Sequence, residues 1–443
     1  MTPDGSVTVL AHGLGGSTDL PIPFTYALIG AAWALAFTFA VVALAWRKPK
    51  FDPAKPARAL PNWVTTVVDA PATRWIAAML GLLFTIWVAL AAFFGPQNAD
   101  NPLPGVFYVL LWIALVALSV LLGPVWRAIS PVRAVLRLMG GRSGGRSYPA
   151  KLGYWPAVAG LFAFVWLELA SPDPGSLGAI RLWLIIYLAV TLAGALWFGR
   201  DWCARADPFE VYSTVASRLA PLRRDPETRR VAVGNPFNHL PSLAVYPGIV
   251  AVMAVLLGST AFDSFSAIPR WRNFVDDTAT SSLTATLIRT LGLLLFIAVV
   301  AFTFTLASIA TGGVDRERRR ELPGLMAHSL IPIVIGYVFA HYLTYLFEKG
   351  QQTVILLADP LNRGWNLFGL DNAEVSYFLS QHPAVLATLK VGFVVAGHVA
   401  AVIAAHDRAL RVLPSGHQLT GQLAMMLVMV GYTFTGLYLL FGG

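Results

Sequence analysis

The chain has 443 residues, of which 56% are hydrophobic and only 12% are charged, and its mean hydropathy is +0.64. Soluble domains are about half apolar and about a quarter charged, so this composition excludes an ordinary soluble domain and indicates a membrane protein. The formal net charge is +9, and the single cysteine, Cys203, excludes a disulfide within the chain.

Long apolar segments recur along the whole chain. A helix that crosses a bilayer needs about 20 mostly apolar residues. In chain order, such segments occupy residues 24–46, 75–94, 106–125, 154–170, 180–198, 243–257, 283–311, 325–347, 384–406 and 423–441. We therefore predict an all-α fold: a polytopic transmembrane bundle of about ten spans that forms one integral membrane domain over residues 1–443, with the lipid bilayer as its main partner.

The basic residues are concentrated in alternate connections between these spans. Of the 32 lysines and arginines, 25 fall in five such connections, namely residues 47–74, 126–153, 199–242, 312–324 and 407–422. Lysine and arginine are retained in cytoplasmic loops, so we predict that these five are inner connections and that both termini lie outside. The arginine-rich composition favours a bacterial inner membrane. We interpret the positive net charge as an attraction of these basic connections to anionic lipid headgroups, and not as a sign of nucleic-acid binding.

The longest inner connection contains an amphipathic segment. Apolar residues recur at helical spacing over residues 208–219. We expect this segment to form an interfacial helix along the inner membrane surface.

A few ionisable residues fall inside the predicted spans, where charge is costly and commonly functional. Glu168 and Arg181 stand near the outer ends of adjacent antiparallel spans, and we interpret them as a structural ion pair. Lys390 lies about two turns below the outer end of the ninth span.

The eighth span carries polar residues on one face of its outer half. At 100° per residue, Tyr337, His341, Tyr345 and Glu348 fall on that face. His341 and Lys390 reach similar depths on consecutive spans. We predict that these residues line one outward-opening ligand cavity. The alternative is hydrogen bonding between helices without any ligand.

The ninth span has small residues on two sides. Gly397 and Ala401 share the face of Lys390, and a second stripe begins at Gly392. Small residues allow helices to approach closely in membranes, so we expect tight packing on both sides.

The inner half of the ninth span carries three candidate metal ligands. These are His398, His406 and Asp407. The two histidines are rotated about 80° from each other and lie about 12 Å apart along one helix, so they share a metal only where the helix breaks. The alternative is that Asp407 caps the helix end and pairs with Arg408 or Arg411. The cofactor is left open, with a divalent metal as one alternative.

Several segments resemble the fenitrothion hydrolase-like family of bacterial multi-pass membrane proteins. They are AHGLGGSTDLPIP (11–23), FGRDWCARADPFEVYSTVASRL (198–219), GSTAFDSFS (258–266), AHSLIPIVIGYVFAHY (327–342), DPLNRGWNLFG (359–369) and GHVAAVIAAHDRAL (397–410). The resemblance implies hydrolysis of an aryl organophosphorothioate ester at phosphorus, with the outer cavity as the site. His341 would then act as base or ligand, Lys390 would stabilise charge, and Glu348 and Asp263 would be ligands.

Two other functions remain open on the sequence alone. A transporter for a small solute or a metal ion could use the same cavity. A membrane subunit of a partner enzyme could use the polar outer loops for docking.

Overall fold

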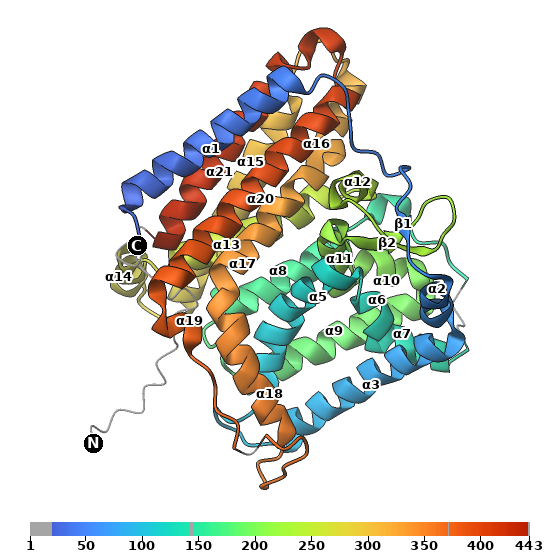
Figure 1. Ribbon diagram of the computed structural model, residues 1–443. Helices are drawn as coiled ribbons and strands as arrows, with labels where there is room; N and C mark the ends of the chain where they lie inside the picture. Colours follow the sequence, from blue (N-terminus) through green and yellow to red (C-terminus); the bar gives the residue numbers. More distant parts are fainter. Residues whose placement is uncertain (1–19, 141–144, 371, 442–443) are drawn as a thin grey trace.

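The computed structural model describes residues 20–140, 145–370 and 372–441 (Figure 1). Ten helical segments within these residues are long and apolar enough to cross a membrane, which confirms the predicted all-α, multi-span architecture. They are α1 (Phe24–Ala45), α3 (Pro71–Phe94), α4 to α5 (Leu103–Leu122), η3 to α8 (Ala150–Leu169), α9 (Leu177–Phe198), α13 (Ile249–Ser266), α15 (Ser282–Ile309), α16 to α18 (Arg316–Ala358), α20 (Pro383–Val412) and η9 to α21 (Thr420–Phe441). Residues 11–19 of the first family-like segment lie outside the described residues.

Four of these segments change helix type along their length. The third contains the π-helix η2 between α4 and α5, and the eighth contains the 3-10 helix η6 and the π-helix η7. The fourth and the tenth begin with the 3-10 helices η3 and η9. Short π-helical stretches inside α-helices are frequent at functional sites. The bounds are α4 (Leu103–Gly105), η2 (Val106–Ala114), α5 (Leu115–Leu122), η3 (Ala150–Leu152), α8 (Trp155–Leu169), α16 (Arg316–Met326), η6 (Ala327–Leu330), α17 (Ile331–Thr344), η7 (Tyr345–Lys349), α18 (Gly350–Ala358), η9 (Thr420–Gln422) and α21 (Leu423–Phe441).

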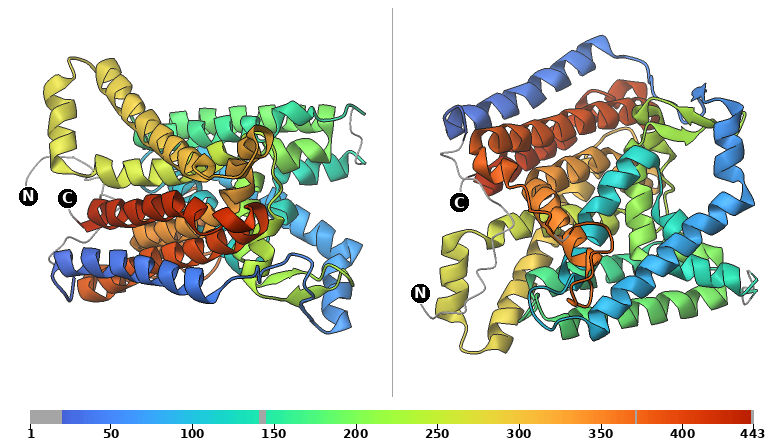
Figure 2. Two further views of the ribbon diagram at one scale, coloured as in Figure 1. Left: turned by 90° about the horizontal axis from the view of Figure 1, so that it is seen from above. Right: turned by 60° about the horizontal axis from the view of Figure 1, so that its bottom comes forward.

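The spans form two groups that lie side by side (Figures 1 and 2). The first helix group contains α1, α13, α15, α17, α20 and α21. The second helix group contains α3, α5, α8 and α9. Helix α8 of the second group packs against α13 of the first, and η2 packs against η7. These contacts define the boundary between the two groups.

Shorter elements occupy the connections. They are β1 (Arg58–Ala59), α2 (Asn62–Asp69), α6 (Trp126–Ile129), α7 (Pro131–Leu138), α10 (Arg200–Ala206), α11 (Pro208–Ala216), η4 (Ser217–Leu219), β2 (Leu222–Arg224), β3 (Val231–Val233), α12 (Pro236–His239), η5 (Leu240–Ser242), α14 (Pro269–Thr278), α19 (Phe378–Gln381) and η8 (Ser415–His417).

The arginine-rich connections meet at one side of the bundle, which we call the inner side. The strands form an antiparallel sheet of order β1-β3-β2, with Arg58 and Leu222 both paired to Val233, so connections 47–74 and 199–242 lie together. Arg137 donates to the Arg74 carbonyl oxygen and joins connection 126–153 to them. The orientation of this side relative to the cell stays a prediction.

The outward faces of several spans are apolar, as contact with lipid requires. On α15, the exposed fractions of Leu291, Leu295 and Phe302 are 66%, 61% and 63%. Side chains of this kind would cost free energy in water, whereas lipid tails solvate them. Contact with lipid tails therefore explains why these apolar side chains are exposed on the outside of the bundle.

Two segments differ from the sequence-based expectation. The sixth span is α13, which runs to Ser266 and not to residue 257, so Asp263 lies in a helix and not in an outer loop. The helix expected along the inner surface is α11, whose residues 208–213 are all buried against α5 and α8. The expectation that it is interfacial was wrong, because protein covers both of its faces.

The ninth span packs closely against the eighth at Gly397. A Cβ added at Gly397 would lie 2.5 Å from the Pro332 carbonyl oxygen, and Gly336 approaches the same place from α17. This confirms the close approach expected at Gly397. A Cβ added at Gly392 would meet nothing within 4 Å. The second stripe is therefore open at Gly392, where the expectation of tight packing was wrong, whereas Ala404 farther along the stripe is buried.

Candidate functional site

A network of buried polar side chains joins α13 to α17 in the first helix group. Asp263 and Ser264 stand near the end of α13, and Tyr337, His341 and Tyr342 stand on α17. Tyr337 and His341 are four residues apart and therefore share a helix face. The exposed fractions of Asp263 and His341 are 6% and 2%, so the network is shielded from solvent.

His341 is held through both ring nitrogens. Its Nε2 lies 2.9 Å from Asp263 Oδ2, and its Nδ1 lies 3.0 Å from Ser264 Oγ. A carboxylate oxygen only accepts, so Nε2 carries a proton and donates to Asp263. In a neutral ring, Nδ1 then accepts from the Ser264 hydroxyl.

Two tyrosines extend the network at its ends. The Tyr342 hydroxyl donates to Asp263 Oδ2 at 2.7 Å. The Tyr337 hydroxyl donates to Ser264 Oγ at 3.0 Å, and it also lies 3.4 Å from the Gly436 carbonyl oxygen on α21. Hydrogen bonds therefore run continuously from Tyr337 through Ser264, His341 and Asp263 to Tyr342.

The Ser264 hydroxyl can donate in two directions. His341 Nδ1 is one acceptor, and the Thr260 carbonyl oxygen, 3.3 Å away, is the other. When a proton is added at Nδ1, the serine hydroxyl can rotate to Thr260 and accept from the imidazolium. The network can therefore hold His341 in either protonation state with small movements.

The second helix group contributes a carboxylate to the same region. Glu168 on α8 lies within electrostatic range of Asp263, and its exposed fraction is 8%. Tyr342 and Tyr345 lie within range of both carboxylates. The cluster of ionisable groups therefore spans the boundary between the two helix groups.

The predicted cavity residues are thus brought together only in part. Tyr337, His341, Tyr345 and Asp263 belong to this cluster. Glu348 is buried farther along the eighth span, where its Oε1 accepts from the Ser380 backbone N–H at 3.1 Å and from the Ser380 hydroxyl at 2.6 Å.

Lys390 is fully buried on α20. It is two turns from Gly397, so it shares the face that packs against α17. The catalytic roles that the resemblance implies for His341, Lys390 and Glu348 stay predictions.

The expected ion pair between Glu168 and Arg181 is not formed. Arg181 Nη2 instead donates to Gln97 Oε1 at 2.5 Å, and the guanidinium lies over the Phe93 ring. Arg181 therefore contacts the segment that follows α3, whereas Glu168 interacts electrostatically with Asp263.

The three candidate metal ligands have protein partners. His398 Nδ1 donates to the Val394 carbonyl oxygen at 2.8 Å. His406 Nδ1 faces Gln422 Oε1 at 2.8 Å, and its Nε2 faces the Trp46 carbonyl oxygen at 2.9 Å. Both nitrogens of His406 therefore join α20 to its neighbours, one at the residue that follows α1 and one at η9.

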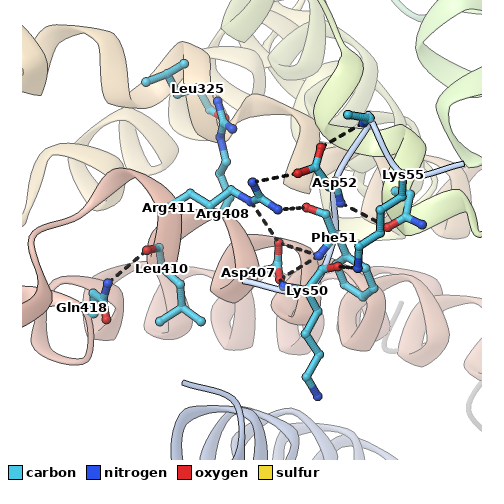
Figure 3. A network of polar contacts seen from close by, with 12 residues as sticks. Lys50, Phe51, Asp52, Lys55, Leu325, Asp407, Arg408, Leu410, Arg411 and Gln418 are labelled. Atoms are coloured by element: carbon cyan, nitrogen blue, oxygen red, sulfur yellow. Dashed lines mark hydrogen bonds and ion pairs between the residues drawn. The ribbon is translucent and has the colours of Figure 1, made fainter. Parts of the chain in front are cut away.

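Asp407 anchors the connection that follows α1 (Figure 3). Its carboxylate accepts from the backbone N–H groups of Lys50 and Phe51, and Arg411 Nε lies 3.9 Å from Oδ2. Arg411 in turn pairs with Asp52 at 3.4 Å. The pairing of Asp407 with Arg411 confirms that part of the alternative interpretation. Within the described ranges, no group of three or more histidine, cysteine, aspartate or glutamate side chains could hold a metal ion.

The comparisons give no relative from which to assign a function. No protein-family model, no curated protein and no solved structure matches this chain. The fold and the exposed apolar faces define a multi-pass helical membrane protein, and its function must be argued from the site.

Sequence reasoning missed two members of the network, Ser264 and Tyr342. Ser264 lies beside Asp263, beyond residue 257, where the sixth span was predicted to end. Tyr342 follows His341 but falls about 100° away from the predicted polar face. A polar segment directly after a short predicted span was the one available signal for Ser264.

Proposed function

We propose that this protein is a transporter that carries protons across the membrane, with the cluster around His341 as its proton-binding site. The observation that carries the proposal is the geometry of His341, which bonds to a carboxylate through one nitrogen and to a hydroxyl through the other. Ionisable side chains buried within membrane spans commonly mark proton relays and ion pathways.

The position of the cluster supports transport. Asp263 and His341 belong to the first helix group and Glu168 to the second, so a movement of one group relative to the other changes their separation. In many transporters the coupling-ion site lies between two such groups, which rock around it. Proton binding reduces the repulsion between the two carboxylates and thereby favours their approach.

Proton flux across reconstituted membranes tests the proposal. We would reconstitute the full chain in liposomes that contain a pH-sensitive dye and impose a potassium diffusion potential with valinomycin. The wild-type protein should admit protons faster than protein-free liposomes do. His341→Gln and Asp263→Asn keep side-chain size while removing titration, and each should lower the flux at least tenfold.

A matched control separates the role of the site from a general effect of losing a buried histidine. His328 is also buried in the eighth span, and its Nδ1 donates to the Leu325 carbonyl oxygen at 3.1 Å, outside the network around His341. His328→Gln should therefore leave the flux unchanged. A wild-type flux equal to that of empty liposomes, or an undiminished flux in His341→Gln, would refute the proposal.

A hydrolase is the second candidate. The sequence resemblance favours it, and so does the Asp263–His341–Ser264 arrangement, in which Asp263 orients an imidazole that could activate water or serine. Ser264 sits inside a helix whose backbone N–H groups are bonded to preceding carbonyls, so they cannot stabilise an oxyanion there. This feature places the hydrolase second.

The hydrolase is tested by nitrophenol release from fenitrothion with purified protein in lipid. Release that is abolished in His341→Ala and in Lys390→Ala would favour it. Release that is unchanged in both variants would remove these residues from any such mechanism.

A further inference from the structure

Helix α11 is a short helix enclosed within the bundle. It follows α10 directly, and the two form a hairpin packed against α5, α8 and α9. Irregular backbone at membrane depth is tolerated only where protein or a water-filled cavity surrounds it. The hairpin therefore lies in the interior of the bundle. There it can connect ionisable side chains near the inner side with those deeper among the spans.

Asp207 caps the first turn of α11. Its Oδ1 accepts from the Tyr187 hydroxyl at 3.0 Å and from the backbone N–H of Phe209 at 3.0 Å, and its Oδ2 accepts from Trp126 Nε1 at 3.0 Å. Burial and the neighbouring negative charge of Glu210 nevertheless raise the pKa of Asp207 to about 7. The ionisable and charged groups that face Asp207 are Tyr187, Cys203, Glu210 and Arg133.

The cluster around Asp207 adjoins the inner surface. Glu210 forms a buried ion pair with Arg133, with Nε to Oε2 at 2.5 Å and Nη2 to Oε1 at 2.6 Å. Arg127 Nε lies 3.6 Å from Glu210 Oε1, and 61% of the Arg127 side chain is exposed. Glu210, whose negative charge acts on Asp207, is therefore paired with an arginine side chain that reaches solvent.

Tyr212 lies farther along α11 and points toward the other cluster. Its ring packs against Trp112 with centroids 4.7 Å apart, and it lies within electrostatic range of Glu168. In the described part of the chain, the Tyr212 hydroxyl and Trp112 Nε1 are both buried without a hydrogen-bond partner. Buried polar groups are nearly always bonded, so an exception calls for a functional explanation.

We propose that α11 forms the inner half of the proton pathway, with Tyr212 exchanging protons with Glu168 and Asp207 exchanging them with the inner aqueous phase. The proposal deepens the transport function above and rests on it. Glu168 and Asp263 then connect Tyr212 to His341 across the boundary between the helix groups.

The transfer through Tyr212 leaves no net change on the tyrosine. The hydroxyl receives a proton from the Glu168 carboxyl group on its oxygen and releases its own proton to a water molecule between Tyr212 and Asp207. Glu168 becomes a carboxylate, Tyr212 stays neutral, and the water passes the proton to the Asp207 carboxylate. Asp207 then releases it to inner water.

Proton flux with three variants tests this pathway in the same reconstituted liposomes. Tyr212→Phe removes only the hydroxyl and keeps the ring against Trp112. Asp207→Asn removes titration at the inner end. Tyr432→Phe is the matched control, because its hydroxyl bonds to Thr303 in the first helix group, away from α11. Thermal unfolding of each variant is measured in parallel.

The expected result separates a transfer role from a structural one. Tyr212→Phe should lower the flux at least tenfold without lowering the thermal unfolding temperature, because the ring that packs against Trp112 is kept. Asp207→Asn should lower the flux similarly, and Tyr432→Phe should not. If His341→Gln abolishes the flux but Tyr212→Phe and Asp207→Asn retain it, the transport function stands and the α11 pathway is wrong. A wild type without flux overturns both.

Discussion

Removal of one partner from the pair of Asp263 and His341 should cost far more stability than the pair itself contributes. His341→Ala removes a donor from a buried carboxylate, and Asp263→Ala removes the acceptor of Nε2–H. Breaking a buried pair on one side typically costs about 3–5 kcal/mol, because a buried charge loses its compensation. We expect each single variant to be destabilised by about that amount.

The double variant should be less destabilised than the sum of the two single variants. Once both groups are absent, no charge is left without its partner, and a hydrogen bond to a charged group is worth about 1.5–3 kcal/mol. The coupling free energy between Asp263 and His341 should therefore be about 2 kcal/mol. Unfolding by sodium dodecyl sulfate in mixed micelles, followed by circular dichroism, measures each free energy.

A distant pair provides the control for this cycle. His328 lies 13 residues from His341 along the same span, about 20 Å away, so their substitutions should be additive to within about 0.5 kcal/mol. Equal additivity for Asp263 and His341 would refute the reasoning, because it would mean that the 2.9 Å contact carries no net interaction.

The remaining predictions concern the inner side and the packing of the first helix group. The pKa of Asp207 is about 7 in the folded chain, against 3.8 as its ordinary value. Its stabilising contribution is therefore complete below about pH 4 and is lost as the pH rises to about 7, by at most about 4 kcal/mol. In Asp207→Asn, the free energy of unfolding should depend less on pH between these values. An unchanged pH dependence would contradict the raised pKa of Asp207. Arg133→Lys cannot reproduce the two-pronged contact with Glu210 and should cost at least about 2 kcal/mol in chemical unfolding, with a neutral result counting against the buried pair. Gly397→Ala should lower the free energy of unfolding by about 1–3 kcal/mol, because its Cβ would meet the α17 backbone. Gly392→Ala on the same helix should be neutral or slightly stabilising, because its Cβ would meet nothing within 4 Å. Equal effects of the two substitutions would contradict the packing of α17 on α20.

The sequence predicted the spans well because the physical requirement is simple. An apolar segment of about 20 residues has few alternatives to crossing the bilayer, and arginine-rich connections mark one side. The polar face of Tyr337 and His341 was also predictable, since residues four apart share one side of a helix.

The errors have identifiable causes. The sixth span was ended at residue 257 because Ser259, Thr260, Asp263 and Ser264 lower the hydropathy of the segment that follows. These residues remain helical because their side chains bond within the bundle, for example Thr260 Oγ1 to the Leu256 carbonyl oxygen at 2.9 Å. Hydropathy reports the average solvent of a segment and cannot reveal such partners.

The position of α11 was unpredictable for a related reason. Helical spacing of apolar residues indicates one buried face, but it does not distinguish a lipid surface from a protein interior. Phe209 and Tyr212 pack against aromatic side chains of the spans, including Phe164 and Trp112. Which helices are neighbours depends on tertiary packing, and the contact of His341 with Asp263 depends on it equally.

Nitrogen NMR of the protein in lipid, with labelled histidine, tests the central claim most directly. The chain has 8 histidines, and the His341 signals are identified by their absence in His341→Gln. The chemical shifts of the two ring nitrogens distinguish the neutral ring from the imidazolium. We predict that the His341 ring takes both forms when a proton gradient is imposed across the membrane, and that Asp263→Asn alters their proportions. A His341 ring that keeps one form throughout would contradict proton exchange at this site.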